Sequence, residues 1–292
     1  MNRLAVVAAL ALGLGGSAQS GGEILFWTTS PIPSLRAMRP DGTHVRRIAG
    51  GQNAKRPSLS PDRRWVAFDG TPTGKPPLSD FDVQVVRVEG TQRRTVVATT
   101  DWELDAKWSR DGKRLSFSRM PPGADWRHSI VCTVRLDGSG LRKLGPGTDA
   151  RWSPDGTRLV VAAPGAASEG DLFVVNADGS GRELLLANGQ LKRPAGWSLD
   201  GKRILFTQFH DAGAGTYVNG DVYLMNADGT GVSRLTADPA DDAAADWSPD
   251  GSQILFTRNR TGRSQIYAMR LDRTHLRNLS GKRTDEFDPS WR

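Results

Sequence analysis

One short motif recurs through the sequence and constrains the fold more than any other feature. The pattern Trp-Ser-x-Asp-Gly occurs four times, beginning at Trp108, Trp152, Trp197 and Trp247. A degenerate copy runs from Leu59 to Arg63, and Trp291 begins a sixth that breaks off at Arg292. Successive anchor positions, meaning the Trp or its counterpart Leu59, are 44 to 50 residues apart. This period is typical of the four-stranded blades of β-propellers.

Each period contains four predicted strands separated by turns. The Ser-Pro-Asp-Gly segment favours a turn, because Pro fixes φ and Asp-Gly tolerates a positive φ. A short apolar run follows as the second strand, for example Ile204–Phe206 and Ile254–Phe256. A third strand such as Asp171–Asn176 leads through a turn at Asp178-Gly179 to a fourth. Outside the first 20 residues no stretch has a helical pattern, so an all-β fold is predicted.

The two ends of the sequence together supply one blade. Ile24–Thr28 resembles the second-strand run Ile254–Thr257, yet no Trp-Ser-Pro-Asp-Gly precedes it. The missing innermost strand is found at the other end, at about Glu286 to Trp291. We therefore predict that residues 21–292 form a six-bladed antiparallel β-propeller, closed by pairing of the N- and C-terminal strands. Such closure leaves no long free sheet edge at the join.

The first 20 residues have the pattern of a targeting segment. Arg3 supplies a basic start, Leu4–Leu14 is an uncharged run of eleven residues, and Gly16-Ser17-Ala18 is a small-residue cleavage site. Eleven residues are too few to span a bilayer, which needs about 20. A retained N-terminal anchor is the alternative. We predict a signal peptide over residues 1–20, no transmembrane segment, and a periplasmic or secreted protein.

Composition argues against several classes of protein. The single cysteine, Cys132, cannot form an intramolecular disulfide or a CxxC site. There are 39 basic and 32 acidic residues, but the basic ones are spread through all blades and alternate with acids, so no nucleic-acid partner is expected. No Gly-x-Ser-x-Gly elbow of a serine hydrolase is present. We expect a monomeric, non-enzymatic protein without a cofactor, with Ca²⁺ as the one candidate ion.

The repeated motif resembles a known family. Its Trp-Ser-Pro-Asp-Gly anchors and the apolar run after each are similar to the PD40, or WD40-like, repeat of the TolB-like six-bladed propellers. The resemblance extends over about residues 22–292 and implies a six-bladed propeller that acts as a scaffold in the cell envelope. TolB also carries an N-terminal α/β domain, for which the sequence after the predicted signal peptide has no counterpart.

The candidate binding positions lie three residues before each anchor. In a propeller the innermost strand lines the central channel, and its start opens on one face. These positions are Arg56, Asp105, Asp149, Pro194, Ala244 and Asp288. The carboxylates that meet there could hold Ca²⁺ through oxygen ligands or bind a cationic group of a partner. Alternatively, they are solvated and paired with nearby basic residues, namely Lys55, Arg56, Lys107, Arg151, Lys192 and Arg193.

Loops between second and third strands open on the same face and are long and varied. Such loops on a rigid scaffold commonly carry binding residues, and Trp126 and Tyr217 are aromatic side chains within them. Our first hypothesis is a non-enzymatic scaffold that binds a protein or peptide at the channel mouth. The proposed contacts are Arg56, Asp105, Trp126, Asp149, Tyr217 and Asp288. The alternative is a Ca²⁺-dependent propeller hydrolase whose channel carboxylates are the metal ligands.

Overall fold

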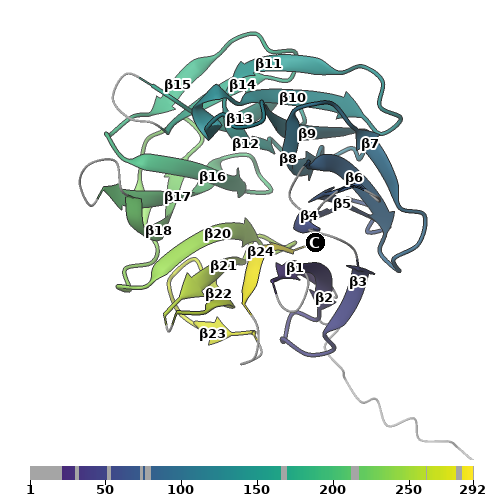
Figure 1. Ribbon diagram of the computed structural model, residues 1–292. Helices are drawn as coiled ribbons and strands as arrows, with labels where there is room; N and C mark the ends of the chain where they lie inside the picture. The colour runs from purple at the N-terminus through teal and green to yellow at the C-terminus, as the bar shows by residue number, and fades with distance from the viewer. Residues whose placement is uncertain are drawn as a thin grey trace, which may run out of the picture.

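The computed structural model describes residues 22–29, 33–50, 54–72, 75, 80–165, 170–211, 217–260, 262–280 and 285–291. Within these residues the strands form six four-stranded antiparallel sheets arranged as blades around a central axis (Figure 1). The predicted six-bladed propeller is therefore confirmed. The predicted signal peptide at residues 1–20 lies outside the described residues.

Each blade is named here in chain order, with its strands given from the innermost to the outermost. Blade I contains β24 (Glu286–Trp291), β1 (Ile24–Thr28), β2 (Ser34–Met38) and β3 (Arg46–Gly50). Blade II contains β4 (Lys55–Leu59), β5 (Trp65–Gly70), β6 (Asp82–Arg87) and β7 (Arg94–Val97). Blade III contains β8 (Trp102–Trp108), β9 (Arg114–Met120), β10 (Ile130–Arg135) and β11 (Arg142–Pro146).

The remaining blades follow the same order. Blade IV contains β12 (Thr148–Trp152), β13 (Arg158–Ala163), β14 (Asp171–Asn176) and β15 (Glu183–Leu186). Blade V contains β16 (Leu191–Trp197), β17 (Arg203–Asp211), β18 (Tyr217–Asn226) and β19 (Ser233–Arg234). Blade VI contains β20 (Asp241–Trp247), β21 (Gln253–Asn259), β22 (Ser264–Arg270) and β23 (Arg277–Asn278). A 3-10 turn, η1 (Trp126–His128), is the one helical element among the described residues.

Blade I closes the ring with strands from both ends of the sequence. The C-terminal strand β24, yellow in Figure 1, pairs antiparallel with the purple β1, with Ile24 opposite Trp291 and Thr28 opposite Glu286. Because β24 is the innermost strand, it takes the place of the missing Trp-Ser-Pro-Asp-Gly strand before Ile24. The predicted closure is confirmed.

The anchor turns repeat one set of hydrogen bonds. In blade IV, Ser153 Oγ donates to Asp155 Oδ1 at 2.6 Å, and the backbone N–H of Arg158 donates to Ser153 Oγ at 3.0 Å. Gly156 has a φ of 70°, which favours glycine. The same Ser–Asp contact, at 2.5 to 2.6 Å, joins Ser60 to Asp62, Ser109 to Asp111, Ser198 to Asp200 and Ser248 to Asp250. These carboxylates therefore serve the turns.

The repeated tryptophans pack between neighbouring blades. Trp152 Nε1 donates to the carbonyl of Lys107 in the preceding blade at 3.3 Å, and the guanidinium of Arg114 lies 4.8 Å from the Trp152 ring. Equivalent bonds of 2.9 to 3.2 Å run from Trp108 to Ser58, from Trp197 to Arg151 and from Trp247 to Gly196. The hydrophobic clusters likewise combine side chains of two adjacent blades. The core thus lies between the blades and holds the innermost strands around the axis.

Candidate site at the channel mouth

Every innermost strand is interrupted by a bulge at the position three residues before its anchor. The strand register shifts there in all six blades. Five of the six residues have a positive φ of 46° to 57°, namely Arg56, Asp105, Asp149, Ala244 and Asp288. The sixth is Pro194, whose ring holds φ negative. Residues other than glycine are strained in this region, and bulges redirect side chains near functional sites.

All six bulge residues line one central cavity of about 520 Å³. The innermost strands β4, β8, β12, β16, β20 and β24 all contribute to its wall. Its charged lining is mixed, with basic side chains Arg56, Arg63, Lys107, Arg110, Arg151 and Arg193 and acidic side chains Asp105, Asp149, Asp241, Asp246 and Asp288. The repeat therefore brings the predicted mouth residues Arg56, Asp105, Asp149 and Asp288 together.

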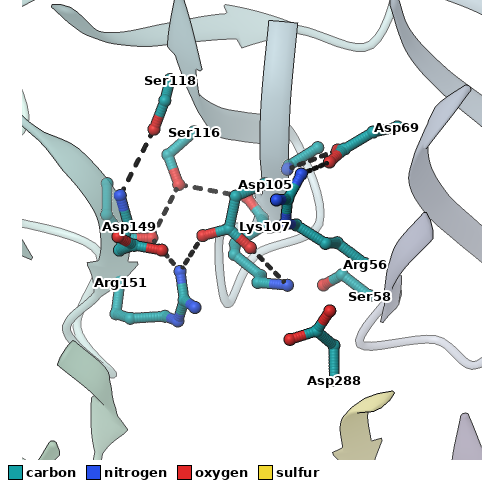
Figure 2. Close-up of polar contacts among 12 residues, drawn as sticks. Arg56, Ser58, Asp69, Asp105, Lys107, Ser116, Ser118, Asp149, Arg151 and Asp288 are labelled. Atoms are coloured by element: carbon teal, nitrogen blue, oxygen red, sulfur yellow. Dashed lines mark hydrogen bonds and ion pairs between the residues drawn. The ribbon is translucent and has the colours of Figure 1, made fainter. Parts of the chain in front are cut away.

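Asp105 is buried between two cations of the cavity wall (Figure 2). Its Oδ2 accepts a hydrogen bond from Arg151 Nη1 at 2.5 Å, and its Oδ1 lies 3.0 Å from Lys107 Nζ. Burial acts to raise the pKa of Asp105, but the charges of Arg151 and Lys107 outweigh it and hold that pKa well below its usual range. Asp105 is thus an ionised link between blades III and IV, with both oxygens already engaged.

Arg56 is held by a second buried carboxylate. Its Nη1 donates to Asp69 Oδ2 at 2.9 Å, across the pair of strands β4 and β5. Asp69 is fully buried, and burial raises its pKa despite the charge of Arg56. Asp69 also accepts the backbone N–H of Ala106 in blade III at 3.4 Å. This carboxylate therefore fixes Arg56 at the cavity and joins two blades.

Asp149 and Asp288 are less tightly bound than Asp105. Asp149 Oδ2 lies 3.9 Å from Arg193 Nε, and the side chain of Arg193 is half exposed. Asp288 Oδ2 accepts the indole N–H of Trp27 at 2.7 Å, and Figure 2 shows Asp288 at the edge of the Asp105 network. The pairing alternative therefore describes Asp105 closely. Asp149 and Asp288 therefore have fewer charged partners than Asp105.

Of the two predicted aromatic contacts, Trp126 alone has a side chain that the structure describes. Trp126 begins η1 in the loop between β9 and β10, where it is partly buried, and Asp125 caps the turn by accepting the backbone N–H of Arg127. Tyr217 begins β18 opposite Asp211, but its side chain lies outside what the structure describes. Trp126 is not among the residues that line the cavity. Their role in binding stays a prediction.

The sequence reasoning placed Lys192 near the channel mouth, but it did not predict that a second set of charges lies at the junctions between blades. Two residues before the bulge, the innermost strands of blades III, V, VI and I place a charged side chain in the interior, namely Glu103, Lys192, Asp242 and Glu286. The available signal was this shared spacing from the anchor motif. In addition, no group of three or more His, Cys, Asp or Glu side chains within the described ranges is arranged to hold a metal ion.

Comparisons with known proteins agree with the geometry. The family model of the TolB β-propeller domain, PD40, matches residues 196–292, which contain two complete anchor motifs and β24. The chain is a six-bladed propeller that is similar in fold to TolB. It resembles the crystal structure of TolB from Acinetobacter baumannii with a TM-score of 0.76 at 18% identity, over 92% of this chain. The chain spans 66% of the length of that TolB chain.

Other solved propellers are similar in fold. A chain of the nidogen/laminin complex matches with a TM-score of 0.71 at 12% identity, covering 93% of this chain and 98% of that one. An oligogalacturonate lyase in complex with manganese matches with a TM-score of 0.59 at 14% identity, covering 88% of this chain and 73% of that one. A search of curated proteins found no match. Because these names include both a binding complex and an enzyme, the fold alone does not separate the two classes.

Proposed function

We propose that this TolB-like propeller is an exported, non-catalytic scaffold that binds a protein or peptide partner at the channel mouth. The observation that carries the proposal is the ring of bulges, which holds five residues other than glycine in strained conformations around one cavity. Strain of this kind persists where the surrounding structure enforces it, and it clusters at functional sites. The bulge residues lie within paired strands of the blades, so little ordering is required when a partner binds.

The charges of the mouth favour a partner with a basic side chain or a free amino group. Asp149 and Asp288 offer oxygens to such a group, whereas Arg151 and Lys107 already occupy Asp105. A cavity of about 520 Å³ lies within the size range of ligand sites and admits a side chain or a chain end. Charged groups of this kind set orientation and association rate.

Export is the second part of the proposal. The basic start, apolar run and small-residue site in residues 1–20 support it. Nowhere in the described ranges is there a helix long and apolar enough to cross a membrane. Intact-mass measurement of the protein recovered from the periplasm or medium tests the cleavage. A mature N-terminus near Gln19 or Gly21 is expected, and full-length protein confined to the cytoplasm would contradict it.

A peptide-display selection against the immobilised full chain tests the mouth directly. Selected peptides should contain basic residues and lose affinity as salt is raised. The double variant Asp149→Asn/Asp288→Asn should bind them at least about tenfold more weakly, which corresponds to about 1.4 kcal/mol. Glu183→Gln, an exposed change on the outermost strand β15, is the matched control. Equal binding by the double variant, or equal loss in the control, would overturn the proposal.

A further inference from the structure

The junction between blades IV and V shows how a charge is accommodated between two blades. Lys192 of β16 is completely buried, and its Nζ lies 3.5 Å from Asp171 Oδ1 of β14. The same Nζ donates to the carbonyl of Gln190 at 2.6 Å. A backbone bond of 3.0 Å from Lys192 N–H to Gly170 O fixes the register of the two blades. Here a cation from one blade meets an acid from the next.

The junction between blades II and III has the same backbone but the opposite charge. Glu103 N–H of β8 donates to Phe81 O at 2.7 Å, the counterpart of the bond from Lys192 to Gly170. The acid facing Glu103 is Asp82, the first residue of β6, just as Asp171 is the first residue of β14. At this junction, therefore, an acid stands where the other junction has a lysine.

The junction between blades V and VI also sets an acid opposite an acid, but it supplies cations. Asp242 of β20 accepts two hydrogen bonds from Arg258, both of 2.6 Å. Asp221 of β18 accepts one from Arg234 at 2.5 Å and lies 2.7 Å from His210 Nε2. Each buried acid there has a basic partner, as buried charges require.

The II–III junction leaves three buried oxygens without a partner. Asp80, Asp82 and Glu103 are each at most 6% exposed, and Asp80 Oδ1, Asp82 Oδ1 and Glu103 Oε2 accept no hydrogen bond. The other oxygen of Glu103 accepts Thr99 Oγ1 at 2.5 Å. Burial raises the pKa of Asp82 to about 6, and burial with the charge of Asp82 raises the pKa of Glu103 to about 7. The residues of this site therefore neutralise its negative charge only in part.

Lys75 shows what kind of cation the site takes. Its half-exposed side chain forms an ion pair with Asp80 Oδ2. That hydrogen bond raises the pKa of Lys75 most, and the charges of Asp80, Asp82 and Glu103 add to the effect. All three acids therefore act on one ammonium group that approaches from solvent, although three of their oxygens remain unpaired.

We propose that the acidic site formed by Asp80, Asp82 and Glu103 at the II–III junction binds a primary ammonium group of a ligand. An ammonium has three N–H donors, and the junction holds three buried oxygens that lack a hydrogen-bond donor. The site is separate from the central cavity, whose lining does not include these acids. The inference therefore goes beyond partner binding at the channel mouth.

Thermal unfolding of the full chain at pH 8 tests the proposal, because this pH lies above the raised pKa values of Asp82 and Glu103. The probe is Nα-acetyl-lysine methylamide, and the control ligand is the same compound acetylated on Nε, both at matched ionic strength. The probe should raise the Tm by about 3–6 °C at ten times its Kd. Glu103→Gln and Asp82→Asn should each abolish this shift, whereas Glu183→Gln should retain it. Both test variants remove a like charge, so they should fold.

Three outcomes would overturn the proposal. A Tm rise with CaCl₂ and none with the probe would identify a metal site. No rise with either would mean that a proton or Lys75 satisfies the acids. An equal rise with the acetylated control would show that the ammonium is not recognised. Glycinamide, which carries a free α-amino group and no lysine side chain, separates the two sources of the ammonium group. A larger rise in Tm with glycinamide than with the lysine probe would point to a peptide N-terminus.

Discussion

Blade junctions II–III and IV–V have the same backbone hydrogen bond but differ in interior charge. The shared bond belongs to the scaffold of the repeat, whereas the difference in charge marks the proposed ligand site. Both have the backbone bond from the innermost strand to the residue before the neighbouring third strand. In one junction Lys192 meets Asp171, and in the other Glu103 meets Asp82. The repeat therefore specifies hydrogen bonds and packing, while the interior charge varies from blade to blade. A junction that departs from neutrality is where a ligand is expected.

The largest effect on stability is expected at junction IV–V, where Lys192 neutralises Asp171. Lys192→Met should lower the free energy of unfolding by about 3–5 kcal/mol, because Asp171 would keep a buried charge without its lysine. Urea unfolding followed by Trp fluorescence measures the loss. Lys202→Met, at an exposed position in the turn before β17, is the matched control. A loss below about 1 kcal/mol, similar to that of the control, would mean that the pair does not hold the blades.

The contribution of junction II–III to stability should depend on pH, in the direction set by the raised pKa values of Asp82 and Glu103. Asp82 and Glu103 bind protons more tightly in the folded chain than in the unfolded one, so stability falls as pH rises from about 4 to about 7. For each group, a pKa shift of about two units corresponds to about 2–3 kcal/mol in the free energy of unfolding. The groups facing the pair are Lys75, Asp80, Thr99 and Arg119.

Urea unfolding at several pH values checks this slope. Glu103→Gln should reduce the slope of the curve between pH 4 and 7, since the glutamine does not titrate and Asp82 remains. Asp178→Asn, in an exposed turn where a hydrogen bond from Ser180 lowers the pKa, should leave this window unchanged. A wild-type curve that rises through the same window would contradict the raised pKa values.

The sequence was sufficient for the fold because its signal is local. Trp-Ser-x-Asp-Gly encodes a turn and an interblade tryptophan within a few residues, so its spacing, together with the blade divided between the two ends, predicted six blades. The closure of β24 on β1 followed from counting strands. The bulge at the third residue before each anchor was not foreseen, since Arg56, Asp105 and Ala244 share no side-chain property that signals a positive φ.

The site was only partly predictable because its contacts join distant parts of the chain. Spacing placed Asp105, Asp149 and Asp288 at one mouth, and the cavity includes all three. It did not show that Arg151, 46 residues later, binds Asp105 across a blade boundary. Nor did it show that Trp126 begins a short 3-10 turn away from the cavity lining. Such pairings depend on the packing of neighbouring blades.

Substitutions at the channel mouth should lower the free energy of unfolding less than Lys192→Met does at junction IV–V. Asp105→Asn should cost about 1.5–3 kcal/mol, the usual value of hydrogen bonds to charged groups, because Arg151 and Lys107 lose their common partner. Asp149→Asn should cost under about 0.5 kcal/mol, since its distance to Arg193 is 3.9 Å and both side chains reach solvent. Equal losses in the two variants, measured by urea unfolding, would contradict the division of the mouth into structural and ligand-binding carboxylates.

The measurement that tests the comparison most directly is the stability of Glu103→Lys at pH 8. This change gives junction II–III the Lys–Asp pair of junction IV–V and supplies the buried acids with an ammonium. We predict a free energy of unfolding higher by about 1–2 kcal/mol, as expected when unsatisfied buried groups gain a partner. The lysine probe should no longer raise the Tm of this variant. A variant less stable than the wild type, with an undiminished response to the probe, would contradict the account.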